Sequence, residues 1–84
     1  MESPYNKAQK AMAEIKSAIH QLLTVNTVGM KNSEIGRALG IYAGHQGHEG
    51  HISRTLLAIM EAEGVVAQDK ETKKWSLRTL INNE

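Results

Sequence analysis

Apolar side chains recur at helical spacing in the middle of the chain, where residues 51–64 form the clearest amphipathic pattern. One face of this stretch is aliphatic and is made by Ile52, Leu56, Leu57, Ile59 and Met60. The opposite face carries hydrogen-bonding and small side chains, namely His51, Arg54, Thr55, Ala58 and Glu61. Gly64 follows where a glycine in the left-handed conformation typically ends a helix. The pattern predicts a helix that buries its aliphatic face and leaves the other face free.

A longer apolar stripe precedes this helix. Ser3 can cap a helix, and Pro4 suits the first helical position. The stripe covers about 140° of a helical wheel and is formed by Ala8, Ala11, Met12, Ile15, Ala18, Ile19, Leu22 and Leu23. We expect a helix of about 20 residues, which is long for so small a domain, ending near residues 24–26. Because two short helices and a hairpin cannot cover the stripe from residue 5 to residue 23, it predicts a homodimer through this helix.

Between these two helices, residues 32–39 show a short helical pattern. Asn32 and Ser33 supply capping oxygens, and the apolar positions are Ile35, Ala38 and Leu39. Gly36 is a poor helix former, which indicates either the close approach of another backbone or only a cost in helix propensity. Gly40 is expected to end the helix, with Ile41 folding back onto the core.

Two β-prone stretches follow the central helix. Residues 65–68 and 74–77 predict the strands of a hairpin around the polar turn 69–73. Their buried face is expected to hold Val66, Trp75 and Leu77. Residues 27–30 can add one brief strand, and residues 79–84 read as a frayed polar tail. The predicted class is mainly α with a small β-hairpin, an α+β fold.

The composition limits the classes of protein that fit. The 84 residues allow a single domain, spanning residues 1–84 with a core over about residues 8–78. No cysteine is present, and neither a signal peptide nor a membrane-spanning run is visible, so we expect a cytoplasmic protein with no membrane partner. The formal net charge of +1 does not suit a strong nonspecific nucleic-acid binder. The absence of phenylalanine leaves little for stacking on single-stranded bases.

Three motifs in order resemble those of winged helix-turn-helix domains in bacterial regulators. SEIGRALGI at residues 33–41 resembles the second helix of such domains, and ISRTLL at residues 52–57 resembles the start of a recognition helix. EAEGVV at residues 61–66 resembles the passage from that helix into the wing. The resemblance covers residues 8–78 and implies three helices with a two- or three-stranded wing. One departure is that residues 40–50 replace the usual turn of three or four residues.

The resemblance implies sequence-specific binding of double-stranded DNA by helix 51–64 in the major groove. The implied role is that of a small transcriptional regulator or of the DNA-reading module of a larger system. The candidate contacts from the helix and the loop before it are His48, His51, Ser53, Arg54 and Thr55. Arginine has the best shape for the guanine edge, while serine and threonine more often reach phosphates. The hairpin lysines Lys70, Lys73 and Lys74 can touch the flanking backbone or the minor groove, or they simply belong to a solvated turn. The alternative function is a winged-helix module that binds protein and not DNA.

The loop at residues 42–50 carries closely spaced histidines. His45, His48 and His51 are weak candidates for metal ligands, because imidazole binds zinc, nickel and copper. Their spacing matches none of the strong zinc signatures, so no metal site is predicted. A loop that lies along phosphates and a plain surface loop are the other interpretations, and a metal-responsive regulator is a third functional hypothesis.

No catalytic set is visible in the sequence. It contains no cysteine nucleophile, no carboxylate pair in a pocket-forming pattern and no phosphate-binding glycine loop that leads into a Lys-Ser/Thr helix. We therefore expect no enzymatic activity, no cofactor and no small-molecule substrate.

Overall fold

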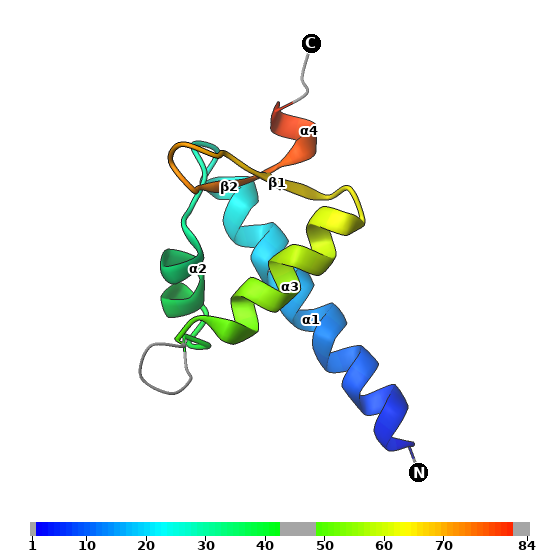
Figure 1. Cartoon of the computed structure of the whole chain (residues 1–84). Helices are drawn as coiled ribbons and strands as arrows, with labels where there is room; N and C mark the ends of the chain where they lie inside the picture. The colour runs from blue at the N-terminus through cyan, green and yellow to red at the C-terminus, as the bar shows by residue number, and fades with distance from the viewer. Residues whose placement is uncertain (1, 43–48, 82–84) are drawn as a thin grey trace.

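Three helices, a two-stranded hairpin and a short terminal helix make up the fold (Figure 1). We describe it from a computed structural model, which covers residues 2–42 and 49–81. The elements are α1 (Pro4–Val25), α2 (Asn32–Ala38), α3 (His51–Ala62), β1 (Val66–Gln68), β2 (Trp75–Leu77) and α4 (Arg78–Ile81). Helices α1 and α3 cross, α2 lies to one side of the crossing, and the hairpin lies above it. The predicted class is confirmed, and the shape is compatible with a winged helix.

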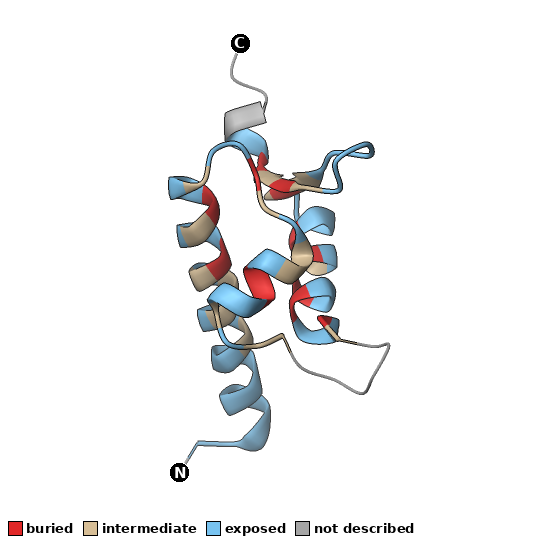
Figure 2. Cartoon of the chain, turned by 90° about the vertical axis from the view of Figure 1, so that its left-hand side faces the viewer, coloured by how far each residue is buried: buried red, intermediate tan, exposed pale blue. Residues whose placement is uncertain are grey.

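Helix α1 is only partly used by the core. It begins as predicted, because the side chain of Ser3 accepts a hydrogen bond from the backbone N–H of Asn6 at 3.1 Å. Ile19 and Leu23, in its second half, are fully buried. Its first half projects beyond the other elements and is exposed almost all round (Figures 1 and 2). An ion pair of 3.0 Å between Lys16 and Glu63 links the middle of α1 to the end of α3.

The start of α2 differs from the prediction. The capping residue is Lys31, and its backbone N–H donates to the Glu34 carboxylate at 2.8 Å, so Asn32 and Ser33 are already inside the helix. The end of α2 is as predicted: Gly40 has a φ of 71°, and the N–H of Ile41 donates to the carbonyl of Gly36 at 2.8 Å. The side chain of Asn32 is thereby free to act elsewhere.

Gly36 marks a close approach of α2 to its neighbours. A Cβ atom at this position would lie 3.0 Å from Cδ1 of Tyr42 and 3.1 Å from Oγ of Ser53. The prediction of a close approach was therefore correct, but the neighbours are side chains and not another backbone. The missing side chain lets α2 and the start of α3 pack directly against each other.

Helix α3 is rotated from the orientation that the sequence predicted. Its buried residues are Ser53, Leu56, Leu57 and Met60, while Ile59 is half-buried. Ile52, expected in the core, is 42% exposed. The physical reason is that Ser53 lies inward, where its hydroxyl finds hydrogen-bond partners at the start of α2. A buried polar group with such partners costs little free energy.

The hairpin pairs antiparallel in the register Val66↔Leu77, Ala67↔Ser76 and Gln68↔Trp75. Val66, Trp75 and Leu77 are buried as predicted. Met30 forms a single bridge to Trp75, with backbone hydrogen bonds of 3.0 and 2.7 Å, so the expected third strand is reduced to one residue pair.

The prediction of a frayed tail was wrong for its first residues. Residues 79–81 belong to α4, whose first N–H, that of Arg78, donates to the carbonyl of Val65 at 2.9 Å. Residues 82–84 lie outside the described part of the chain.

One apolar core joins all the major elements. It consists of Ile19, Leu23, Ile35, Leu56, Leu57, Met60, Val66, Trp75 and Leu77. Although α1 has 22 residues, no helix within residues 2–42 and 49–81 is both long and apolar enough to cross a membrane.

Replacing Leu56 by alanine should test the placement of α3 against this core. Leu56 is 4% exposed, so the change should lower the free energy of unfolding by about 2–5 kcal/mol. Val28, which is 80% exposed, provides the control, and Val28→Ala should stay within about 0.5 kcal/mol of the parent. Urea denaturation of both variants gives the comparison. Equal stabilities for the two variants would contradict the observed packing.

Candidate nucleic-acid interface

A buried hydrogen-bond cluster fixes the start of α3. The hydroxyl of Ser53, which is fully buried, lies 2.7 Å from Oδ1 of Asn32 and 3.2 Å from the carbonyl oxygen of Gly50. The side-chain amide of Asn32 donates to the same Gly50 carbonyl at 3.1 Å. The prediction that Ser53 contacts DNA was therefore wrong, because its hydroxyl holds α2 and α3 together and cannot reach a ligand.

Gly50, the residue before α3, has no room for a side chain. Its φ is 81°, and an added Cβ would lie 2.6 Å from Nδ2 of Asn32 and 2.9 Å from Cε1 of Tyr42. Both the backbone conformation and the neighbours thus require glycine. Because the chain enters α3 through this constrained residue, the first turn of the helix has a defined position.

The free face of α3 begins with His51, Arg54 and Thr55, all of which are exposed. The guanidinium of Arg54 donates from Nη2 to the carbonyl of Glu49 at a long 3.4 Å, so it stays near the start of the helix. The hydroxyl of Thr55 donates to the carbonyl of His51 at 2.9 Å, which leaves its lone pairs as acceptors. This face can therefore offer a charged planar donor and an acceptor to the edge of a base pair.

Hydrogen bonds define the turn of the β1–β2 hairpin, which we call the wing. The Oδ1 atom of Asp69 accepts from the backbone N–H of Thr72 at 2.9 Å and from that of Glu71 at 2.8 Å. These two hydrogen bonds, with that from Thr72 the larger cause, lower the pKa of Asp69. The carbonyl of Lys73 accepts from the side chain of Gln68 at 3.1 Å. The turn presents Lys70 and Lys73 in exposed positions.

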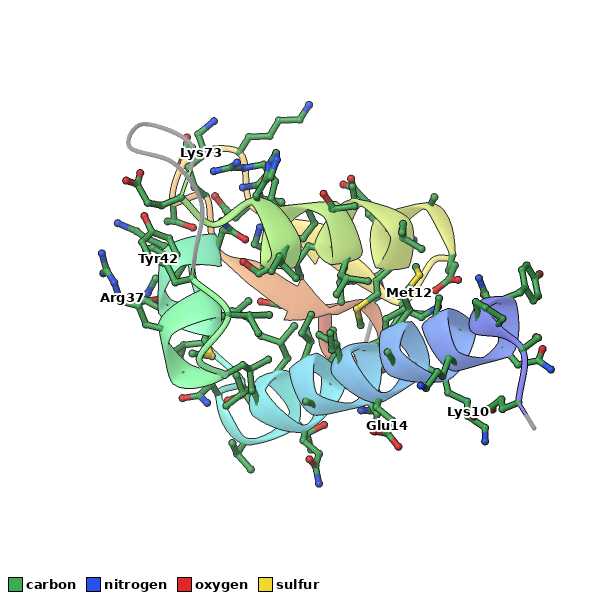
Figure 3. All side chains as sticks on the ribbon, turned by 90° about the horizontal axis from the view of Figure 1, so that it is seen from below. Lys10, Met12, Glu14, Arg37, Tyr42 and Lys73 are labelled. Carbon is green, nitrogen blue, oxygen red and sulfur yellow. The ribbon has the colours of Figure 1, made fainter. Side chains whose placement is uncertain are left out.

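The three candidate lysines differ in exposure: Lys70 and Lys73 are exposed, and Lys74 is half-buried. Figure 3 shows Lys73 on the side of the molecule where α3 lies, away from α1. Lys74 is half-buried and lines a hollow along the hairpin together with Val28 and Ser76. Lys73, at the tip of the hairpin, thus lies on the same side of the molecule as α3, whereas Lys74 is partly covered.

The histidine predictions are only partly covered by the structure. His45 and His48 lie outside the described residues, whereas His51 is the first residue of α3. Within residues 2–42 and 49–81, no group of three histidine, cysteine, aspartate or glutamate side chains could hold a metal ion. The metal hypothesis, which needs the two other histidines, stays a prediction.

Two features of this region were missed in the sequence. The guanidinium of Arg37 lies 4.5 Å from the centre of the Tyr42 ring, in a cation–π contact at the outer side of α2 (Figure 3). Ile52 is exposed next to the free face of α3. The signal for Ile52 was available, because Ser53, Leu56 and Met60 also follow helical spacing. No such signal existed for Arg37.

No protein-family model matches the chain, and comparison with curated proteins and with solved structures likewise gave no match. Functional inference therefore depends on the geometry described above and on the order of the motifs.

Ser53→Ala should separate a structural role from a contact role. Because the change leaves Oδ1 of Asn32 without its hydrogen-bond donor, we expect a loss of about 1–3 kcal/mol in the free energy of unfolding. Thr55→Ala, on the exposed face, is the matched control and should change stability by less than about 0.5 kcal/mol. Thermal and urea denaturation give both values. A fully stable Ser53→Ala protein would show that the cluster is not needed.

Asp69→Ala should change how stability depends on pH. A carboxyl whose folded pKa lies below its ordinary value of 3.8 stabilises the fold above that pH and loses this effect as the pH falls through the folded pKa. The parent protein should therefore lose stability below pH 3.8 more steeply than Asp69→Ala. Urea denaturation at neutral and acidic pH measures the difference, and parallel profiles would rule out the role of the turn carboxylate.

Proposed function

We propose that this protein binds double-stranded DNA in a sequence-specific manner, with α3 in the major groove and the tip of the hairpin on the flanking backbone. The observation that carries the proposal is that the exposed start of α3 and Lys73 at the wing tip lie on one side of the molecule. A helix and a loop placed in this way can contact a groove and the adjacent phosphates together. A single copy makes one such contact, so the proposal does not require a dimer.

Arg54 is the side chain best placed to recognise a base. It comes from the first turns of α3, the part of a recognition helix that reaches base edges. Its exposed guanidinium can donate two parallel hydrogen bonds to O6 and N7 of guanine. His51 and Thr55 flank it on the same face and are suited to a neighbouring base or a phosphate.

The conformation of Lys73 supports a role for the wing tip. Lys73 has a φ of 67°, in the left-handed region where glycine or asparagine is usual. A lysine there costs roughly 1 kcal/mol relative to glycine. A cationic side chain at a strained, exposed position is typical of a contact that function requires.

The low net charge indicates few phosphate contacts. Arg54, Lys70 and Lys73 are the exposed cations of the proposed face, against a net charge of +1 for the chain. Release of counterions from two or three phosphates predicts a slope of about −2 to −3 in a plot of log binding constant against log salt concentration. Recognition would then depend on the base contacts of α3 more than on nonspecific attraction.

A protein-binding module is the second candidate, favoured by the exposure of Ile52 beside the free face of α3. Apolar contacts respond little to salt, whereas phosphate contacts weaken steeply as salt rises. Fluorescence anisotropy with random and selected duplexes at two salt concentrations distinguishes the two candidates.

Arg54→Ala and Lys73→Ala should affect DNA binding in different ways. Loss of a bidentate base contact, worth about 1–3 kcal/mol, should lower the preference of Arg54→Ala for its selected site by roughly 5- to 150-fold. Lys73→Ala should weaken all duplexes alike and reduce the salt slope by about one unit. Alanine keeps the strain at this φ equal to that of lysine, so stability should not change.

Lys10→Ala provides the matched control, because this exposed lysine lies on α1 and points away from α3 (Figure 3). It should leave affinity, specificity and salt slope unchanged. If Arg54→Ala retained the full preference for the selected site, the proposed role of α3 would be wrong and protein binding would become the leading function.

A further inference from the structure

The first half of α1 carries an apolar seam that the described chain covers only in part: Tyr5 and Ala8 are exposed, and Met12 is half-buried against the core. Tyr5, Ala8, Met12, Ile15, Ile19 and Leu22 follow one another at intervals of three and four residues, the spacing of the core positions in a coiled coil. Ile19 is buried in the core, but Tyr5 is 72% exposed and Ala8 is exposed as well. Figure 1 shows this half of the helix projecting away from the body. The same stripe thus serves the core at one end and is free at the other.

An apolar groove lies where the seam meets the body. The groove is lined by Met12 and Ile15 of α1 and by His51, Ile52, Thr55 and Leu56 of α3, and its volume is about 300 Å³. It therefore adjoins two of the side chains of the proposed DNA face, His51 and Thr55. Ile52, 42% exposed, forms its outer wall. Ile15 therefore stands between the free seam and the groove, and a chain that packs along the seam reaches the groove at its end.

We propose that a second copy of this chain covers the seam, with the two α1 helices packed antiparallel about a two-fold axis near residue 10. In this register the numbers of facing residues add up to 20. Tyr5 then faces the partner's Ile15, and Ala8 faces the partner's Met12. Each pair occurs twice by symmetry, and in each a larger side chain meets a smaller one, which is the arrangement that fills space between helices.

The same register brings the exposed tyrosine to the groove. Tyr5 of each copy lies beside the partner's Ile15, so its ring can enter the groove between α1 and α3 of the other copy. This gives an occupant to the apolar groove and a burial site to the large exposed aromatic side chain of α1. One contact thus accounts for the apolar groove and for the exposed tyrosine, and the two-fold symmetry forms this contact twice.

The residues that flank the seam also fit an antiparallel pair. On one flank, Ala11 meets its own copy near the axis and Pro4 meets the partner's Ala18, so small residues allow the helices to approach closely. On the other flank, Glu2 meets the partner's Lys16, which gives two ion pairs of opposite charge. Figure 3 shows Lys10 and Glu14 on the side of α1 away from α3, outside the contact.

These flanking charges are accessible for such pairing. Within one copy Glu2 pairs with Lys10 at 2.8 Å, and Lys16 pairs with Glu63 at 3.0 Å. Glu2 and Lys16, the two side chains proposed to meet across the dimer, have opposite charges. Each also has a partner within its own copy. An uncharged seam with complementary ends favours a second copy over an acidic or basic partner.

Sedimentation of the full chain tests the proposal without DNA, so its outcome is independent of the proposed function. The parent protein should dimerise at micromolar concentration. Ala8→Glu places a charge opposite the partner's Met12 and should raise the dissociation constant at least roughly tenfold. Asn6→Glu introduces the same charge in the same exposed turn but outside the seam, and should dimerise like the parent. Circular dichroism checks that both variants are folded.

Two charge reversals test the register. Glu2→Lys or Lys16→Glu alone creates two like-charge pairs in the dimer and should raise the dissociation constant by roughly 2- to 25-fold. When the two variants are mixed, both interchain pairs become opposite in charge, so heterodimers should form with close to parental affinity. A monomeric parent at high micromolar concentration, equal effects of Ala8→Glu and Asn6→Glu, or no gain on mixing would each overturn the proposed interface.

Discussion

The position of α3 depends on one small set of buried hydrogen bonds. The Ser53 hydroxyl and the Asn32 amide share the carbonyl of Gly50, which joins the starts of two helices that are distant in sequence. Removing any member would leave a polar group without its partner in a place that water cannot easily reach. Apolar packing decides that α3 is buried, but this cluster decides which of its faces is buried.

The wing is attached to the same core by different means. Trp75 is buried and also pairs through its backbone with Met30, so β2 is held both by side-chain packing and by the segment that follows α1. Arg78 returns to Val65 through a backbone hydrogen bond directly after the hairpin. The hairpin turn is thus connected to two strands that are attached to the core. This attachment defines the position of the turn and its lysines relative to α3.

Sequence patterns predicted the structural features that depend on residue spacing. They failed where a single polar contact determines the orientation of a helix. Periodicity predicts the lengths of α1 and α3 and the hairpin with Val66, Trp75 and Leu77 buried. The conformational freedom of glycine predicts the end of α2 at Gly40. The buried face of α3 could not be predicted in this way. A helical wheel places the polar Ser53 outside, and it contains no information on the hydrogen bond that Ser53 forms with Asn32. The partial burial of Lys74 could not be predicted either, because only the pairing of the strands makes it less exposed than Lys73. Arg54 and Lys73 were correctly expected to be exposed, and what they bind is a proposal.

The contact of Tyr42 with Gly50 has a consequence for how this chain can vary. A Cβ atom added to Gly50 would lie 2.9 Å from Cε1 of Tyr42, and these two residues flank residues 43–49 in the sequence. Tyr42 and Gly50 are therefore neighbours in space, and contacts within the described chain hold them there. Closing a loop between fixed neighbouring ends costs only slowly more as the loop lengthens. Insertions or deletions there would leave the packing of α2 on α3 intact, so length at this point can evolve separately from the fold.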